Sequence, residues 1–224
     1  MSLWGDEELA QSPVVANRTM NRARGLTGVN SYARELGLDP AGWLAERAGP
    51  QAWLDLCSGE GLALLAAAAR LPQAVLTGVD LVGPVVPRPV PADVELVTAS
   101  LADWAPGRRY DLITCVHGLH YLGDKLALLA RAADWLTADG LLLAQFDPTA
   151  LRGPAGTSLA RPALAALRAA GFAYQPRRHL LTLRGRRNVS LPFTYLGADP
   201  GAGPNYTGQP AVASVYRPTR RQVD

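Results

Sequence analysis

The segment from Trp53 to Arg70, WLDLCSGEGLALLAAAAR, joins an apolar strand to an alanine- and leucine-rich helix through a turn that contains two glycines. A strand that passes directly into a helix is typical of α/β folds, in which strands and helices alternate. Gly59 and Gly61 allow the backbone to turn tightly and to approach a ligand closely. Because ligands in open α/β sheets lie at the carboxyl ends of strands, this junction predicts a ligand site.

The rest of the chain repeats this alternation. We expect further strands at residues 74–81, 94–99, 110–116 and 140–146, and helices at residues 39–49, 124–140 and 161–172. The proline-rich segment 82–93 forbids a long helix between the second and third strands. The last two expected strands, 179–185 and 211–217, have no helix between them, so we expect them to pair antiparallel. The sequence predicts an α/β fold with a seven-stranded, mostly parallel sheet, helices on both faces, an antiparallel C-terminal strand pair and an N-terminal helical lid.

Composition excludes several classes of protein. The two cysteines, Cys57 and Cys115, form neither a disulfide framework nor a zinc-binding spacing, and the chain has only three histidines. We therefore expect no metal site. The chain has no apolar run of about 18 residues and its start does not resemble a signal peptide. We expect a cytoplasmic protein with no membrane partner, present as a monomer or a homodimer.

Charge is unevenly distributed, although the net charge is only +3. Residues 148–198 contain no acidic residue but eight arginines, at positions 152, 161, 168, 177, 178, 184, 186 and 187. Such a segment is either a solvated surface of an arginine-biased protein or a patch that binds nucleic acid or an anionic substrate. The segment lacks the interleaved aromatic residues expected of a protein that binds single strands. A nucleic-acid partner is the less favoured interpretation.

Acidic residues at the first turn narrow the choice of ligand. Asp55 and Glu60 flank the glycines and would repel a phosphate, but they suit a ligand that carries positive charge. Asp80 ends the second strand about 20 residues beyond the turn, which is the usual place for an acid that binds the two ribose hydroxyls. S-adenosylmethionine combines a ribose, a cationic centre and the absence of phosphate, so it fits this pattern.

Five segments in order resemble the motifs of class I S-adenosylmethionine-dependent methyltransferases. They are LDLCSGEG, GVDL, VELVTASLADW, YDLITCVHGLHYL and LTADGLLLAQFD, and the resemblance covers residues 51–147. It implies a Rossmann-like methyltransferase domain at residues 51–224 that follows the lid segment at residues 1–50. It also implies that the enzyme uses S-adenosylmethionine and releases S-adenosylhomocysteine.

The resemblance assigns ten residues to the cofactor, in four groups that follow the first four strands. They are Asp55, Cys57, Gly59 and Gly61 at the methionine part, Asp80 and Leu81 at the ribose, Ser100 and Leu101 at the adenine edge, and Val116 and His117 beside the sulfonium. The chain departs from the usual pattern at two positions. Cys57 replaces the first glycine of the turn, and Ser100 replaces the acid that contacts adenine.

The candidate catalytic residues are His117 and His120, which follow the fourth strand. A protonated nucleophile needs a general base, and histidine titrates near neutral pH. The alternative is that either ring only packs beneath the substrate. The candidate substrate residues are Arg22 and Tyr32 in the lid segment, Tyr121 after the fourth strand, and Asn205 and Tyr206 in the loop 193–210. That loop instead forms a dimer contact if it lies away from the site.

The sequence therefore predicts an enzyme that transfers a methyl group to an O, N or C nucleophile of a small molecule, such as a compound of specialised metabolism. The absence of a separate recognition module favours a small substrate. Two alternatives stay open. One is an RNA or protein methyltransferase that uses the arginine-rich segment, and the other is a non-methylating S-adenosylmethionine-binding protein.

Overall fold

The main sheet has seven strands, and their order confirms the predicted α/β class. A computed structural model describes residues 2–16, 23–86 and 88–219. The strands, in the order 3-2-1-4-5-8-7, are β1 (Ala52–Leu56), β2 (Val75–Asp80), β3 (Val94–Thr98), β4 (Tyr110–Cys115), β5 (Leu136–Gln145), β7 (Ala173–Gln175) and β8 (Leu180–Arg184). Strands β1 to β5 are mutually parallel, whereas β8 lies antiparallel between β5 and β7. The carboxyl ends of β1 to β4 therefore lie along one edge of the sheet.

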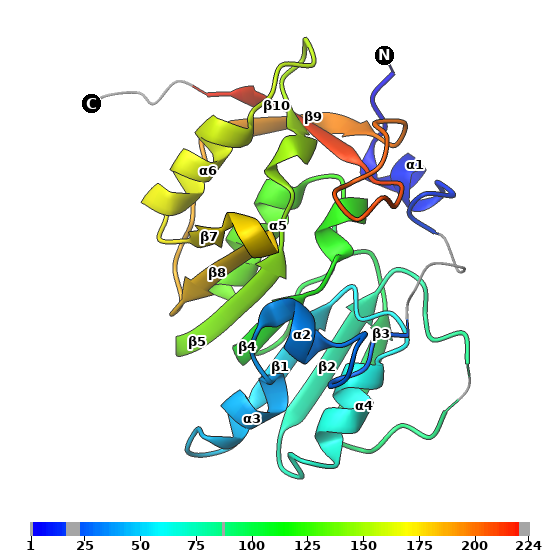
Figure 1. Ribbon diagram of the computed structural model, residues 1–224, viewed down its shortest axis with the longest axis vertical. Coiled ribbons are helices and arrows are strands. Elements are labelled where there is room, and N and C mark those ends of the chain that lie inside the picture. Colours follow the sequence, from blue (N-terminus) through cyan, green and yellow to red (C-terminus); the bar gives the residue numbers. More distant parts are fainter. Residues whose placement is uncertain (1, 17–22, 87, 220–224) are drawn as a thin grey trace.

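A second, small sheet lies beyond the carboxyl end of β5 and is seen at the top of Figure 1. It consists of β6 (Leu151–Arg152), β10 (Ala213–Pro218) and β9 (Phe193–Asp199), in that order. The expected pairing of 179–185 with 211–217 is wrong, because β8 pairs with β5 and β7 while β10 pairs antiparallel with β9. Segment 193–210 begins as a strand rather than a loop, since Gly197 is the only glycine or proline before Pro200.

Helices cover both faces of the main sheet, as predicted. They are α1 (Asp6–Ala10), α2 (Tyr32–Leu36), α3 (Pro40–Ala45), α4 (Leu62–Ala68), α5 (Lys125–Asp134) and α6 (Ala160–Ala169), with short 3-10 helices η1 (Gly118–Tyr121), η2 (Pro148–Ala150) and η3 (Pro176–Arg178). One core layer contains α2, α3 and α4, and the other contains α5 and α6. Successive residues of β1 alternate between these layers, because side chains of a strand point to opposite faces. Trp53 lies in the first layer and Leu54 in the second.

The N-terminal segment is helical, but its helices do not stay together. Helix α1 packs on β9 of the second sheet, while α2 and α3 pack on the main sheet at β5 and β4 (Figure 1). The division at residues 1–50 and 51–224 stays a prediction. Between β2 and β3 the described residues contain no helix, in agreement with the prolines there. No helix in the described part of the chain has the length and apolar character of a membrane span.

Candidate functional site

The turn after β1 adopts the left-handed backbone that its glycines allow. Gly59 has a φ of 61° and Gly61 a φ of 69°, and Gly61 is the N-cap of helix α4. Cys57 also has a positive φ, of 59°, although its side chain disfavours that conformation. The amide of Ser58 donates to the carbonyl of Val79 at 3.1 Å, which fixes the turn against the end of β2. The turn is thus a shaped element rather than a free loop.

Asp80 is held at the end of β2 by backbone amides on both sides. Its Oδ2 accepts a hydrogen bond from the amide of Gly59 at 2.9 Å, and its Oδ1 accepts one from the amide of Val82 at 2.9 Å. These bonds fix the orientation of the carboxylate, and each of its oxygens can accept more than one hydrogen bond. The first bond also couples the glycine turn to the carboxylate.

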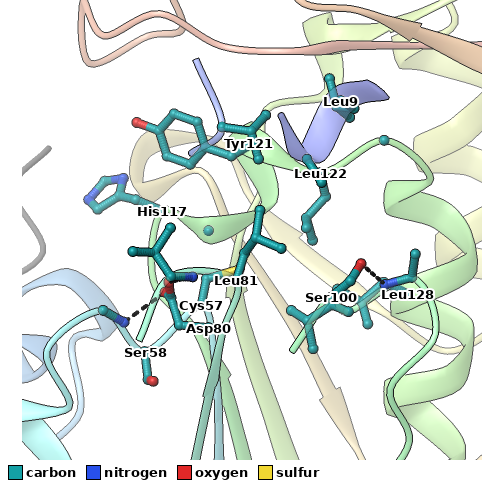
Figure 2. Close-up of a pocket in the computed structure, with 18 of the residues that line it drawn as sticks. Leu9, Cys57, Ser58, Asp80, Leu81, Ser100, His117, Tyr121, Leu122 and Leu128 are labelled. Carbon is teal, nitrogen blue, oxygen red and sulfur yellow. Dashed lines mark hydrogen bonds between the residues drawn. The ribbon is translucent and has the colours of Figure 1, made fainter. Parts of the chain in front are cut away.

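A cavity of about 740 Å³ opens at the carboxyl ends of β1, β2, β3 and β4. Eight of the ten predicted cofactor residues line it, namely Cys57, Gly59, Asp80, Leu81, Ser100, Leu101, Val116 and His117. Figure 2 shows Asp80 and Leu81 below the cavity, His117 on one side, and Leu9 of α1 above it. The cavity therefore lies where the motifs predicted a ligand, and α1 partly roofs it.

Asp55 and Gly61 are the two predicted cofactor residues that do not line this cavity. Asp55 is fully buried, and its carboxylate accepts hydrogen bonds from the hydroxyls of Tyr32 at 2.7 Å and Thr114 at 2.6 Å. Burial raises the pKa of Asp55 to about 7, although both hydrogen bonds act to lower it. Asp55 supports the site from below by joining α2, β1 and β4.

The segment after β3 is anchored by a guanidinium from α5. Arg131 donates hydrogen bonds to the carbonyls of Leu101 and, at 3.0 Å, of Ala102. The hydroxyl of Ser100 accepts a bond from the amide of Ala102 at 3.2 Å. The predicted adenine-edge residues thus belong to an ordered turn on the cavity wall.

His117 is the only one of the two catalytic candidates that lines the cavity. It has a φ of 61°, and its Nε2 lies 3.4 Å from Oε2 of Glu35 on α2. Burial and the nearby Arg24 lower the pKa of His117, and Glu35 only partly offsets them. The imidazole is therefore neutral at neutral pH and keeps one nitrogen lone pair.

His120 lies deeper than His117. Its side chain is 1% exposed, and burial lowers its pKa to about 3, so the ring is neutral. The ring lies 5.1 Å from that of Tyr206, measured between centroids. His120 is not among the residues that line the cavity, and its role in catalysis or packing stays a prediction.

The substrate candidates are only partly brought together. Arg22 lies outside the described residues. Tyr32 and Tyr121 line the cavity, whereas Asn205 and Tyr206 do not. The β9–β10 loop nevertheless reaches the site, because Thr207 and Gln209 line the cavity. Asn205 shapes the loop by accepting hydrogen bonds from the amide and the hydroxyl of Thr207, and Tyr206 stacks on the ring of His179 at 3.8 Å.

Sequence reasoning missed two polar residues beside His117. Glu35 of α2 and Gln145 at the end of β5 are joined by a hydrogen bond of 2.7 Å. Gln145 is only 2% exposed, and a buried amide at the end of a central strand was an available signal. The sequence gave no such signal for Glu35, because a carboxylate on a short helix normally faces solvent. No group of three or more histidine, cysteine or carboxylate side chains in the described ranges is arranged to hold a metal ion.

Comparison with known proteins identifies the family. A family model described as "Methyltransferase domain" matches residues 32–187, which is most of the chain. The chain belongs to this methyltransferase family. The recognition made from the five motifs is confirmed, and so is the assignment as an S-adenosylmethionine-dependent methyltransferase domain.

Solved structures also match the methyltransferase domain, at low identity. The plantazolicin methyltransferase BpumL, in complex with a triazolic desmethylPZN analog and SAH, is 17% identical, with a TM-score of 0.42 over 62% of this chain and 51% of that one. Coclaurine N-methyltransferase, bound to N-methylheliamine and SAH, is 18% identical, with a TM-score of 0.42 over 62% and 47%. Phospholethanolamine N-methyltransferase 2 of Haemonchus contortus is 16% identical, with a TM-score of 0.41 over 51% and 28%. The chain thus spans between 28% and 51% of the length of these proteins. No curated protein matches the sequence.

The residues of the methyltransferase domain fit the cofactor that its family uses. A ribose needs a fixed acceptor, which Asp80 supplies at the end of β2. The adenine needs a narrow apolar slot, for which Leu81 and Leu101 lie on the cavity wall. A carboxylate at the wall and a glycine turn without a lysine suit a cationic ligand better than a phosphate. The domain therefore has the parts that S-adenosylmethionine requires.

Proposed function

We propose that this domain methylates an O, N or C nucleophile of a small molecule, such as a compound of specialised metabolism. The observation that carries the proposal is the form of the cavity. It runs from the glycine turn to His117 and is bordered by α1 and by Thr207 and Gln209 of the β9–β10 loop. Its volume of about 740 Å³ is in the range of pockets that enclose small ligands.

Each part of the site has a role in this proposal. S-adenosylmethionine, when bound, supplies a methyl group already activated by the positive charge on sulfur. Asp80 and the turn at Gly59 hold the cofactor, and Ser100 and Leu101 face its adenine edge. His117 lies beside the nucleophile and holds a lone pair that can accept a proton. The main contribution of the enzyme is then to align two reactants, which can accelerate a displacement by many orders of magnitude.

Calorimetric titration tests the cofactor part of the proposal. The purified protein is titrated with S-adenosylmethionine and with S-adenosylhomocysteine, alongside the Asp80→Ala variant. We expect micromolar binding of both ligands by the wild type and loss of most of that binding in the variant. If the wild type binds neither ligand, the replacements at Cys57 and Ser100 have abolished cofactor binding and the enzymatic proposal fails.

A substrate screen then separates the small-molecule proposal from its alternatives. Turnover of a small compound, with loss on replacement of His117, supports the proposal. Methylation of RNA or of a protein substrate instead supports the first alternative. Normal cofactor binding with no turnover over a broad panel of compounds and macromolecules supports a protein that binds S-adenosylmethionine without transferring its methyl group.

A further inference from the structure

The two cysteines of the chain lie close together beneath the cavity. Asp55 of β1 pairs with Thr114 of β4, so Cys57 and Cys115 stand two residues and one residue beyond this pair. Side chains of a strand alternate between its faces, so a regular strand would direct Cys57 away from the core layer that contains Leu56 and Cys115. The φ of 59° at Cys57 interrupts this alternation, and Cys57 packs against the same core layer as Cys115.

Gly118, which follows β4, leaves open the space that the two sulfurs border. A side chain there would place its Cβ 2.6 Å from Sγ of Cys57 and 2.9 Å from Sγ of Cys115, which is closer than such atoms can pack. The thiol of Cys57 is also hydrogen-bonded to that of Cys115. Neighbouring strands lie about 4.8 Å apart, and a disulfide joins Cα atoms that are about 4.4–6.8 Å apart. The backbone therefore needs no large movement for a disulfide to form.

The two thiols differ in how a small molecule can reach them. Cys57 lines the cavity (Figure 2), whereas Cys115 is 2% exposed and does not line it. A reagent that enters the cavity therefore meets Cys57 first, and Cys115 is placed to react with the product. The hydrogen bond with Cys115, burial and the carboxylates of Asp80 and Asp55 raise the pKa of the Cys57 thiol. Because the thiolate is the reactive form, Cys57 should react faster as the pH rises.

We propose that Cys57 and Cys115 form a site of reversible oxidation, which is open to small disulfides in the cofactor-free protein and closed when the cofactor is bound. The oxidation goes beyond the proposed function, and only its control by the cofactor rests on that function, because the methionine part of S-adenosylmethionine is expected at Cys57.

The reaction takes place in two exchange steps. The thiolate of Cys57 attacks the small disulfide, a bond forms between the two sulfurs, and one small thiolate leaves. The thiol of Cys115 then loses its proton, its sulfur attacks that of Cys57, and the second small thiolate leaves. Two cysteine thiols are thus oxidised by two electrons, and the small disulfide is reduced to two thiols.

Oxidised glutathione is the probe, because a chain with two cysteines gives products that mass spectrometry distinguishes. In mildly alkaline buffer, the folded protein should lose both free thiols and the mass of two hydrogens, and should carry no glutathione at the end. A reducing agent should restore both thiols. Two free thiols that persist in the folded protein, although the urea-unfolded chain reacts, would overturn the proposal. A disulfide that joins two chains would overturn it as well.

Two serine variants test the order of the steps, and each is the matched control of the other. Cys115→Ser should stop at the mixed disulfide, with one glutathione on Cys57. Cys57→Ser, whose remaining thiol is buried, should stay unmodified over the same time. Faster modification of Cys57→Ser would contradict Cys57 as the attacking thiol. If a variant fails to fold, peptide mapping of the wild type early in the reaction decides, since glutathione found only on Cys115 would give the same contradiction.

Protection by S-adenosylhomocysteine tests the control by the cofactor. At about ten times its dissociation constant this ligand leaves about one tenth of the protein free, so oxidation should become about tenfold slower. Calorimetry on the same reduced sample measures the binding. An unchanged rate in a sample that binds the ligand would show that Cys57 is not reached through the cofactor cavity. If the ligand does not bind, the cofactor proposal fails, while thiol loss in the ligand-free protein still decides whether the disulfide forms.

Discussion

Cys57 shows how one residue can depart from a motif and still keep its geometry. It stands where the family usually has glycine, and it holds a φ of 59°. A non-glycine residue loses about 1–2 kcal/mol in that conformation. The replacement is tolerated because the thiol is small. Its hydrogen bond with the thiol of Cys115, together with burial, raises the pKa of the Cys57 thiol above its ordinary value. Gly118 makes room for this contact, since a side chain there would meet both sulfurs.

Two substitutions at this position should therefore differ in their effect on stability. Cys57→Gly relieves the backbone but frees the unfolded chain, so unfolding free energy should change by less than about 1 kcal/mol. Cys57→Val places a β-branched side chain at positive φ and should lose about 1–3 kcal/mol more. Urea unfolding measures both, and calorimetry with S-adenosylhomocysteine should find the glycine variant at least as tight as the wild type. A valine variant as stable as the glycine variant would show that the turn is not strained.

The buried, neutral ring of His120 should make the folded protein less stable at acidic pH. Its pKa is about 3 in the folded protein, because burial excludes the charged ring, and about 6.5 when unfolded. Between these values the unfolded chain binds a proton that the folded protein does not, so stability falls as the pH falls below 6.5. From pH 7.5 to 4.5 this group alone should remove about 2.5 kcal/mol. Urea unfolding measured at several pH values should show that His120→Leu loses less unfolding free energy below pH 6.5 than the wild type. If both proteins lose the same free energy, the lowered pKa of His120 is contradicted.

Individual residues of the site show what the sequence can and cannot predict. Asp80 and Gly59, which the sequence assigned to the same cofactor site, lie together, because a local motif places each at the end of a strand. Glu35 and Gln145 were missed, since they are 110 residues apart and meet only when α2 packs on the end of β5. The motifs predict the residues at the ends of β1 and β2. Contacts between segments far apart in the sequence follow no local spacing, so the sequence does not reveal them.

At the scale of elements, one buried lysine joins the second sheet to the main body. Lys125 is the only lysine in the chain and is 1% exposed. Its Nζ donates to the carbonyls of Leu122 and Val212, at 2.7 and 2.8 Å, and to the hydroxyl of Ser214 at 2.8 Å. Three acceptors match the three donors of an ammonium group, whereas arginine would present a larger, planar set. Lys125, the first residue of α5, thus links this helix to strand β10.

Removing this lysine should loosen the second sheet. Lys125→Met leaves two carbonyls unpaired in the core, and we expect a loss of about 2–4 kcal/mol in unfolding free energy. Hydrogen exchange should show the loss of protection concentrated in β9 and β10. Arg168→Met, at an exposed cation of α6, should change stability by less than about 0.5 kcal/mol. Uniform loss of protection over the whole chain would instead indicate that Lys125 supports the main sheet.

Strands and helices were predicted near their observed places where a local sequence pattern marks them. The first five strands and the helices after residue 38 lie close to their expected places, because apolar runs and glycine or proline boundaries mark them. The helix expected at residues 124–140 ends at Asp134, and β5 begins at Leu136, earlier than expected, because Thr137, Ala138 and Asp139 are not fully buried and give no apolar run. The partners of β8, β9 and β10 were not predictable, because register between distant strands is set by the packing of the whole sheet.

At the scale of the whole molecule, the cavity depends on parts that the motifs do not include. The carboxyl ends of four parallel strands form its floor, as in other open α/β sheets. Its upper border comes from α1, at the start of the chain, and from the β9–β10 loop, near its end. The family model covers neither of these segments. They are the places where substrate specificity can differ while the cofactor site stays the same.

The arginine-rich segment, residues 148–198, lies where it cannot direct RNA into the cavity. None of its eight arginines lies among the residues that line the cavity, and Arg186 is paired with Asp134 at 2.8 Å. RNA held by this surface would not be directed into the site by these side chains. We expect a single-stranded RNA to bind no tighter than the micromolar range at physiological salt, as nonspecific contacts do. Filter binding from 50 to 200 mM salt measures this, with Arg168→Met and Arg184→Met as exposed variants. Submicromolar binding that both variants weaken, and that competes with S-adenosylhomocysteine, would favour a macromolecular substrate instead.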